Sequence, residues 1–267
     1  MNNYNTNIIT HNSTEKDALK ILEKLKNILV KNIDDTERYI YIFGCSHTKC
    51  FIREYIKINN THIMNNYMSS VSLLGFTRET SRLEYKKTII DKIICNNASH
   101  YYLFKFGQVD VEYVLYHKKH ILLENIKDFE FFENLINDYI NVLNDYKKIN
   151  NNIIARGLNI TNYKFYIYNI VRGKKIELNY TEVQNNIIKF NEILMNKCKE
   201  NNIKYFDLIN ETTYRINNDI YIKDEYIGYD YHYRGAETQS VYEENINSYN
   251  YTHEIFIKKL LSIISDI

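Results

Sequence analysis

A glycine, a cysteine, a serine and a histidine follow directly after a run of aromatic and β-branched residues. The run RYIYIFG (38–44) predicts a buried strand, and the polar residues CSHT (45–48) follow it. A strand, a tight turn and a helix would bring Ser46 close to a helix N-terminus, where free backbone N–H groups stabilise developing negative charge. That environment suits a nucleophile, although capping of a helix near Lys49 is the simpler role from position alone. His47 is not assigned as the base, because consecutive side chains in such a turn point apart.

Three further groups of glycine and polar residues follow in order along the chain. They are SSVSLLGFTRETS (69–81), FKFGQVDVE (104–112) and, near the C-terminus, YIGYDYHYRG (226–235). Together with FGCSHT, this series resembles the SGNH, or GDSL-like, hydrolase superfamily. That family has a Gly-Asp-Ser block after the first strand, then a lone glycine, a Gly-x-Asn-Asp block and a final Asp-x-x-His. The likeness is greatest to a branch with Gly-Asp-Ser-His and Phe-Gly-Glu-Ile-Asp blocks, here GCSH and FGQVD, and it spans most of residues 38–235.

The resemblance implies a serine hydrolase and assigns its residues by position. Ser46 would be the nucleophile, His232 the base that takes its proton, and Asp230 the acid that orients the histidine. The oxyanion of the tetrahedral intermediate would be held by the backbone N–H groups of Ser46 and Gly75, with a side-chain donor from the third block. Such a mechanism needs no metal and no organic cofactor.

The chain departs from the family pattern at three positions. Cys45 stands where the first block has its aspartate, which supports the turn. Val109 stands at the asparagine position and cannot donate a hydrogen bond, so Gln108, one residue earlier, is the candidate donor. The proposed acid, Asp230, lies two residues before the histidine instead of three, and Asp224 is a more distant substitute.

Two acidic residues follow the third-block glycine. Asp110 and Glu112, two residues apart after a predicted strand, could face the site together. A structural role for Asp110 in holding the turns of the site is an equally good interpretation.

An alternation of predicted strands and helices must position these residues. Strands are predicted at 38–44, 100–107, 163–171 and 203–209, and helices at 13–35, 48–57, 123–148 and 181–200. The strands lack a clean apolar and polar alternation and amphipathic helices separate them, which indicates a parallel sheet covered on both faces. We therefore predict an α/β fold of three layers, of SGNH-hydrolase or flavodoxin-like type. A polar segment and helix (1–35) would precede a single domain (36–267), with ligands bound where the strands end.

Composition limits the partners. The 267 residues include 34 basic and 33 acidic ones, so no strong overall field attracts nucleic acid or an anionic membrane. No apolar run reaches the length of a membrane span, and the first residues lack the features of a signal peptide. The four cysteines form no C-x-x-C pair, which argues against a disulfide framework or a zinc site. We expect a cytoplasmic protein without nucleic-acid or membrane partners, and the sequence predicts no oligomeric state.

The sequence supports three functions. The first is a serine esterase or O-deacetylase that acts on a small-molecule or glycan acyl ester, with acyl transfer to a sugar hydroxyl as a close relative. The second is a weakened SGNH-like module that binds a glycan or a protein partner. A nucleotide-binding domain is the third, and it is disfavoured because no G-x-G-x-x-G or P-loop follows a predicted strand.

Overall fold

The computed structural model describes most of the predicted domain. The described residues are 37–50, 55–58, 60–68, 71–78, 90–161, 169–171, 174–176, 179–217, 219–228, 233 and 251–265. The helix predicted over 13–35 lies outside them.

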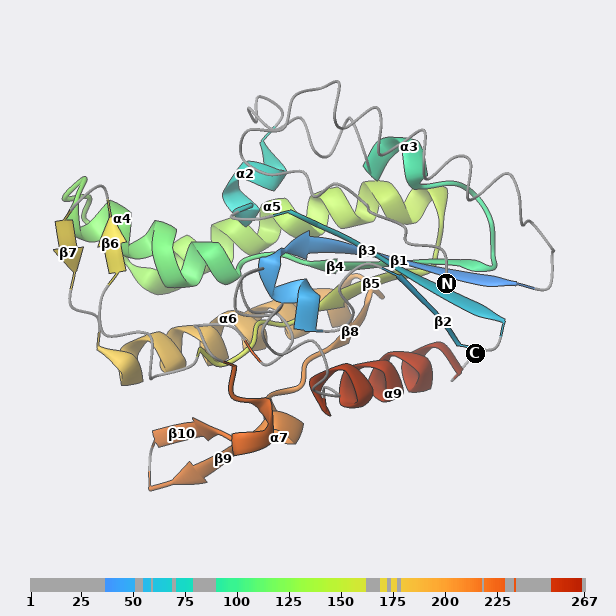
Figure 1. The fold of residues 1–267 in the computed structure, drawn as a ribbon. Coiled ribbons are helices and arrows are strands. Elements are labelled where there is room, and N and C mark those ends of the chain that lie inside the picture. Colours follow the sequence, from blue (N-terminus) through green and yellow to red (C-terminus); the bar gives the residue numbers. More distant parts are fainter. Residues whose placement is uncertain are drawn as a thin grey trace.

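A six-stranded sheet forms the centre of the described part, in the order β2-β3-β1-β4-β5-β8 (Figure 1). Its strands are β1 (Arg38–Cys45), β2 (Tyr55–Ile58), β3 (Thr61–Met68), β4 (His100–Lys105), β5 (Ile153–Arg156) and β8 (Lys204–Phe206). The five neighbouring strands β3, β1, β4, β5 and β8 pair in parallel. Strand β2 pairs antiparallel with β3 at the edge of the sheet. All six residues of β4 are buried, as a central strand covered on both faces requires.

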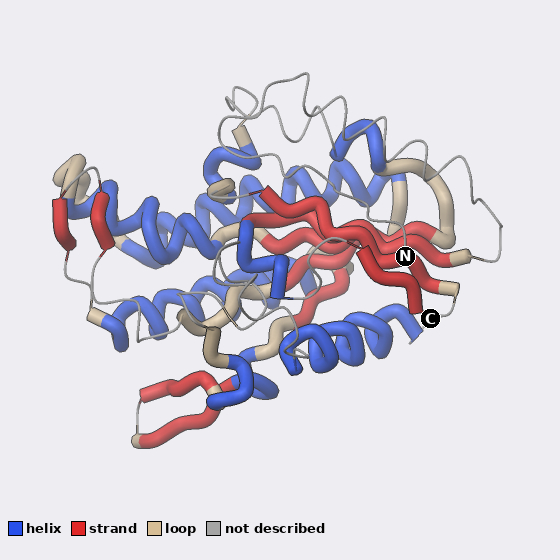
Figure 2. The backbone as a smooth tube through the Cα atoms, in the orientation of Figure 1, coloured by secondary structure: helices blue, strands red, loops and turns tan. Residues whose placement is uncertain are grey.

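Helices cover both faces of this sheet (Figure 2). In Figure 1, α2 (Leu73–Thr77) and α5 (Asp128–Ile149) lie above it, and α6 (Tyr180–Glu200) and α9 (Tyr251–Ser265) lie below. On the α5 side, the rings of Phe104 and Tyr146 stack at 5.5 Å between centroids. On the α9 side, Phe206 and Phe256 lie 5.9 Å apart. The predicted three-layer α/β fold is therefore confirmed.

Short elements complete the described chain. The helical ones are α3 (Asp91–Ile93), α4 (Leu115–His120), α7 (Ile209–Thr212), two 3-10 turns (Ser46–Cys50 and Asp224–Tyr226) and a π turn (Asp110–Val114). Strands β6 (Asn169–Val171) with β7 (Lys174–Ile176), and β9 (Thr213–Ile216) with β10 (Asp219–Ile222), form two small antiparallel sheets.

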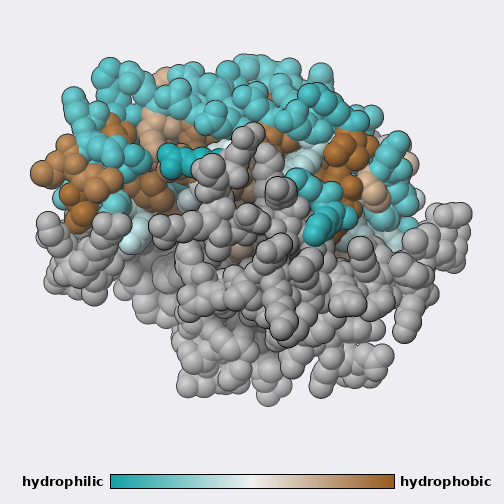
Figure 3. All heavy atoms as spheres, turned by 90° about the horizontal axis from the view of Figure 1, so that it is seen from above, coloured by the Kyte–Doolittle hydropathy of each residue, from teal (hydrophilic) through white to brown (hydrophobic). Residues whose placement is uncertain are grey.

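Among the described residues that Figure 3 shows on the α5 side, most of the surface is hydrophilic. Hydrophobic side chains gather at the end where α4 meets α5, where Leu122, Leu123 and Phe129 are exposed.

Several predicted elements are wrong or incomplete. Where the helix predicted over 48–57 is described, its residues belong to the 3-10 turn Ser46–Cys50 and to strand β2, in which Ile56 pairs with Ile63 of β3. The described end of the strand predicted over 163–171 belongs to the small β6–β7 sheet, and the place beside β4 is taken by β5, which was not predicted. Helix α5 begins at Asp128, later than the predicted start at Leu123, whose positive φ of 54° is incompatible with a right-handed helix. Strand β3 and helix α9 were not predicted either.

Candidate functional site

Polar residues gather where three neighbouring strands end. Strands β1, β4 and β5 lie side by side and in parallel, so their carboxyl ends share one edge of the sheet. Ser46 follows β1, Gln108 follows β4 after a short turn, and Asn159 follows β5. In parallel sheets this edge is where ligands bind. The structure thus brings the first and third predicted blocks together and adds a segment that was not predicted.

Ser46 opens the 3-10 turn Ser46–Cys50, and 9% of its surface is exposed. The hydroxyl of Thr48 donates to the backbone oxygen of Cys45 at 2.9 Å. The side-chain amide of Asn65, on β3, donates to the backbone oxygen of Thr48 at 3.0 Å. Contacts within the turn and from the neighbouring strand therefore hold the serine in place.

The second block forms the start of helix α2. The Ser72 hydroxyl caps this helix and accepts a hydrogen bond from the Gly75 N–H at 3.0 Å. The predicted role of Gly75 as an oxyanion donor would require this N–H to leave its cap.

Asp110 joins the second block to the third. Its carboxylate accepts hydrogen bonds from the backbone N–H groups of Leu73 and Leu74, the latter at 3.1 Å. Asp110 is fully buried, and burial raises the pKa of its carboxyl to about 7, although hydrogen bonds from the backbone N–H groups of Leu73, Leu74 and Asp110 itself act in the opposite direction. These contacts favour the structural role for Asp110, because its carboxylate is directed at the start of α2.

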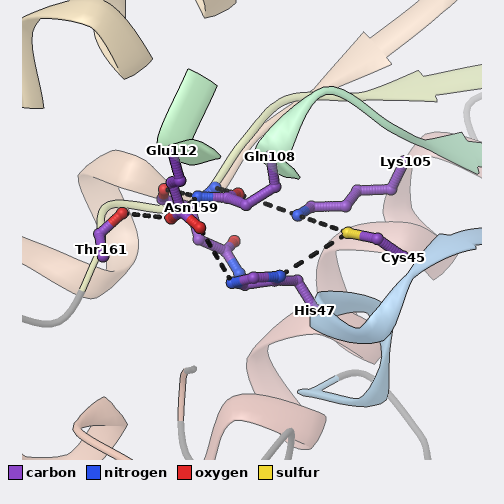
Figure 4. Close-up of polar contacts among 7 residues, drawn as sticks. All are labelled: Cys45, His47, Lys105, Gln108, Glu112, Asn159 and Thr161. Carbon is purple, nitrogen blue, oxygen red and sulfur yellow. Dashed lines mark hydrogen bonds and ion pairs between the residues drawn. The ribbon is translucent and has the colours of Figure 1, made fainter. Parts of the chain in front are cut away.

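Gln108 lies at the centre of a buried network (Figure 4). Its side-chain oxygen accepts from the Lys105 ammonium at 2.9 Å and from the Asn159 N–H at 3.0 Å. Its side-chain nitrogen donates to the backbone oxygen of Asn159 at 3.0 Å and to the carboxylate of Glu112. Both amide hydrogens are thereby engaged. To act as the predicted oxyanion donor, Gln108 would have to break one of these bonds.

Glu112 extends this network to β1. One carboxylate oxygen accepts from the Thr161 hydroxyl and from Gln108, and the other lies 3.8 Å from Nε2 of His47. Burial raises the pKa of Glu112 to about 7, while the hydrogen bonds from Thr161 and Gln108 and the charge of Lys105 act to lower it.

Cys45 closes the network on the side of β1. Its sulfur lies 3.7 Å from Nδ1 of His47 and 3.9 Å from the ammonium of Lys105 (Figure 4). Cys45, His47, Lys105 and Glu112 are all buried. Ionisable side chains are rarely buried together without a role, which makes this cluster part of the candidate site.

Three residues of the site were not predicted from the sequence: Lys105, Asn159 and Thr161. Lys105 ends a buried, mostly apolar strand, and a charged residue at that position was the signal that could have identified it as part of the site. Asn159 and Thr161 could be placed only after β5 had been recognised.

The fourth block is described only in part. Asp230 and His232 lie outside the described residues. Their described neighbours Ile227 and Tyr233 form an antiparallel bridge, and the buried Tyr233 hydroxyl lies 3.0 Å from that of Thr212. Asp224, the alternative acid, is exposed at the start of a 3-10 turn.

Among the described residues, no group of three or more His, Cys, Asp or Glu side chains could hold a metal ion. In the same part of the chain, no helix is both long enough and apolar enough to cross a bilayer. Cys45, Cys95 and Cys198 are free thiols.

We expect Gln108→Ala to lower the free energy of unfolding by about 3 to 5 kcal/mol, because it leaves several buried donors and acceptors without a partner. Urea denaturation would measure the change. Val109→Ala, at the next residue, is the control and should cost about 1 kcal/mol. A large fall in turnover at unchanged stability would instead favour the oxyanion role of Gln108.

Stability should decrease as the pH rises from about 4 to 7. The pKa of Asp110 is raised to about 7 by burial, so the folded chain keeps a proton that the unfolded chain has already released in this range. The full shift in the pKa of Asp110 corresponds to about 4 kcal/mol of unfolding free energy. The raised pKa of Glu112 makes the unfolding free energy fall with pH in the same direction. Asp110→Asn should therefore reduce the pH dependence of the unfolding free energy without abolishing it. The exposed Asp138→Asn is the control, and an equal slope in both variants would contradict the assignment.

Known proteins resemble this chain in fold and not in sequence. No protein-family model matches the chain, and no curated protein sequence matches it significantly. The structure is similar to a GDSL-like lipase from Bacteroides thetaiotaomicron VPI-5482, with 14% sequence identity and a TM-score of 0.51, over 94% of this chain and 99% of the other. It is also similar to a provisionally assigned acylhydrolase from Bacteroides fragilis NCTC 9343, with 13% identity and a TM-score of 0.53, over 91% of this chain and 94% of the other.

At these identities the similarity concerns the fold and leaves the activity to be argued from the site. The order of the sequence blocks predicted the same architecture independently. The chain has the fold of the SGNH, or GDSL-like, hydrolases.

Proposed function

We propose that the chain is a serine hydrolase of SGNH type that cleaves an acyl ester through an acyl-enzyme on Ser46. The observation that carries the proposal is the position of Ser46. It follows the central strand β1 directly, at the edge of the sheet where β4 and β5 also end. The fold it occupies is similar to that of a GDSL-like lipase.

In the proposed mechanism, the Ser46 hydroxyl attacks the ester carbonyl carbon while His232 takes its proton and Asp230 stabilises the charged imidazole. The tetrahedral intermediate collapses, and the leaving alcohol receives the proton from His232. Water then attacks the acyl-enzyme by the same route and releases the acid. Esterase and O-deacetylase activity differ only in the ester that enters, and a small-molecule ester or an O-acyl group on a glycan fits this scheme.

A catalytically weakened binding module is the second candidate, and the oxyanion donors favour it. The Val109 side chain has no donor, the Gln108 amide is engaged on both hydrogens, and the Gly75 N–H donates to the Ser72 hydroxyl that caps α2. Losing one such donor raises the barrier by about 2.7 to 4 kcal/mol.

A fluorophosphonate probe separates the two functions, because it reacts covalently with an activated serine and needs no natural substrate. We expect the wild-type chain to be labelled at Ser46, and Ser46→Ala to lose the label. Mass spectrometry of the labelled peptide identifies the site. A folded wild-type chain that resists the probe and leaves a small activated acetate ester intact would refute the hydrolase function and support the binding module.

A further inference from the structure

Glu112 reaches all three strand ends that form the candidate site. It lies in the π turn after β4, its carboxylate accepts from Thr161 beyond β5, and it faces His47 in the turn after β1. Gln108 donates to the same carboxylate oxygen as Thr161. The side chain is therefore fixed from several sides, and only 7% of the residue is exposed.

Glu112 and Lys105 contact the two residues that flank Ser46. His47, the next residue, lies with Nε2 3.8 Å from the Glu112 carboxylate and with Nδ1 3.7 Å from the sulfur of Cys45. Cys45, the preceding residue, also contacts the ammonium of Lys105 at 3.9 Å. Because the side chains on both sides of Ser46 are held, the backbone that carries its hydroxyl has little freedom.

The charge on Glu112 decides how strongly it holds His47. An ionised carboxylate 3.8 Å from an imidazole nitrogen attracts a proton on that nitrogen, and a protonated carboxyl does so far less. The groups that face the carboxylate include His47 from the β1 turn, Lys105 from β4, Gln108 after β4 and Thr161 after β5. Asp110, on the same π turn, binds the start of α2 instead.

We propose that Glu112 is a positioning residue which, through His47, fixes the turn that carries Ser46 and makes the reactivity of Ser46 depend on ionisation of the Glu112 carboxyl. The inference rests on the proposed function. The pKa of Glu112, raised to about 7, places this ionisation in the neutral range, so the contribution of Glu112 grows as the pH rises through 7.

The test is the rate of fluorophosphonate labelling at Ser46 between pH 5.5 and 9. Glu112→Gln keeps the size and the acceptor oxygen of the side chain and is neutral at every pH, like the protonated wild-type residue. The variant should therefore match the wild type at pH 5.5 and fall behind it by about tenfold at pH 8.5, where the turn is less well fixed. Glu130→Gln, on the exposed face of α5, is the control and should follow the wild type throughout.

A second pair of variants changes the pH at which Glu112 ionises and leaves Glu112 itself in place. Thr161→Val removes a hydrogen bond to the ionised carboxylate and should move the rise in labelling to higher pH, whereas Thr161→Ser keeps the hydroxyl and should restore the wild-type profile. This pair also serves if Glu112→Gln fails to fold. A loss by the same factor at every pH, in either series, would indicate packing alone and would overturn the inference.

The inference and the proposed function can fail separately. If the wild type is labelled and Glu112→Gln keeps its full pH profile, the inference fails and the hydrolase stands. If the wild type is not labelled, the hydrolase fails, and the titration of the His47 ring, followed by NMR, tests the contact itself. An identical His47 titration in the wild type and in Glu112→Gln would then overturn it.

Discussion

His232→Asn is expected to lower the turnover of an activated acetate ester by about four orders of magnitude, because a serine hydroxyl without a base is a poor nucleophile. Ser46→Ala should cause a similar loss, and the double variant should be little worse than either single one, since the two side chains act as a unit. Steady-state hydrolysis of the ester, corrected for the rate without protein, gives the comparison. His120→Asn, on the exposed end of α4, is the control. Equal turnover in the wild type and in His232→Asn would remove this histidine from the mechanism.

The acid is tested in the same assay. Asp230→Asn should also lower turnover by orders of magnitude, and Asp224→Asn should have little effect. The exposed position of Asp224 agrees with a minor role. The reverse pattern would transfer the role to Asp224, and two small effects would indicate a dyad without an acid.

Gly44→Ala is expected to lower the free energy of unfolding by about 4 kcal/mol or more, which is a large part of the stability of an ordinary domain, about 5 to 15 kcal/mol. A methyl group at this position would overlap the backbone oxygen of Lys105 and lie 2.6 Å from Cγ2 of Thr48. The carbonyl belongs to β4 and cannot retreat without disturbing its pairing with β1. Thr48 is held by its hydrogen bond to Cys45.

Circular dichroism and chemical denaturation would measure this loss. Ser46→Ala, in the turn that follows β1, adds no atom and is the control. A Gly44→Ala variant with the wild-type denaturation midpoint would mean that β1 and β4 tolerate a wider separation at this point.

The predictable part of the fold consists of its longest and most regular patterns. Strands β1 and β4 are continuous apolar runs, and α5 and α6 repeat their apolar residues with helical period over about six turns, so both kinds of element could be predicted. The four residues of β5 are too few to show a period. The sequence YIKI of β2 fits a helix or a strand, and its pairing with β3 decided between them.

The site could be predicted to the same extent. Ser46 and Gln108 follow strands that were recognised, and their meeting at one edge follows from parallel pairing. The contact of Asp110 with the N–H groups of α2 and that of Glu112 with Thr161 join segments 36 to 49 residues apart. Hydrogen bonds of this kind depend on the packed structure and leave no local pattern in the sequence.

The long separation of these contacts along the chain also affects how the protein folds. Gln108 meets Asn159 across 51 residues, and Lys105 meets Cys45 across 60. Contacts that close such long loops lose much chain entropy and slow folding, so the site is assembled only when the central strands have all found their neighbours. The chain contains no proline, so no prolyl bond has to isomerise before these strands can pair. If Ser46 is reactive as proposed, recovery of that reactivity after dilution from denaturant would therefore report completion of the sheet itself.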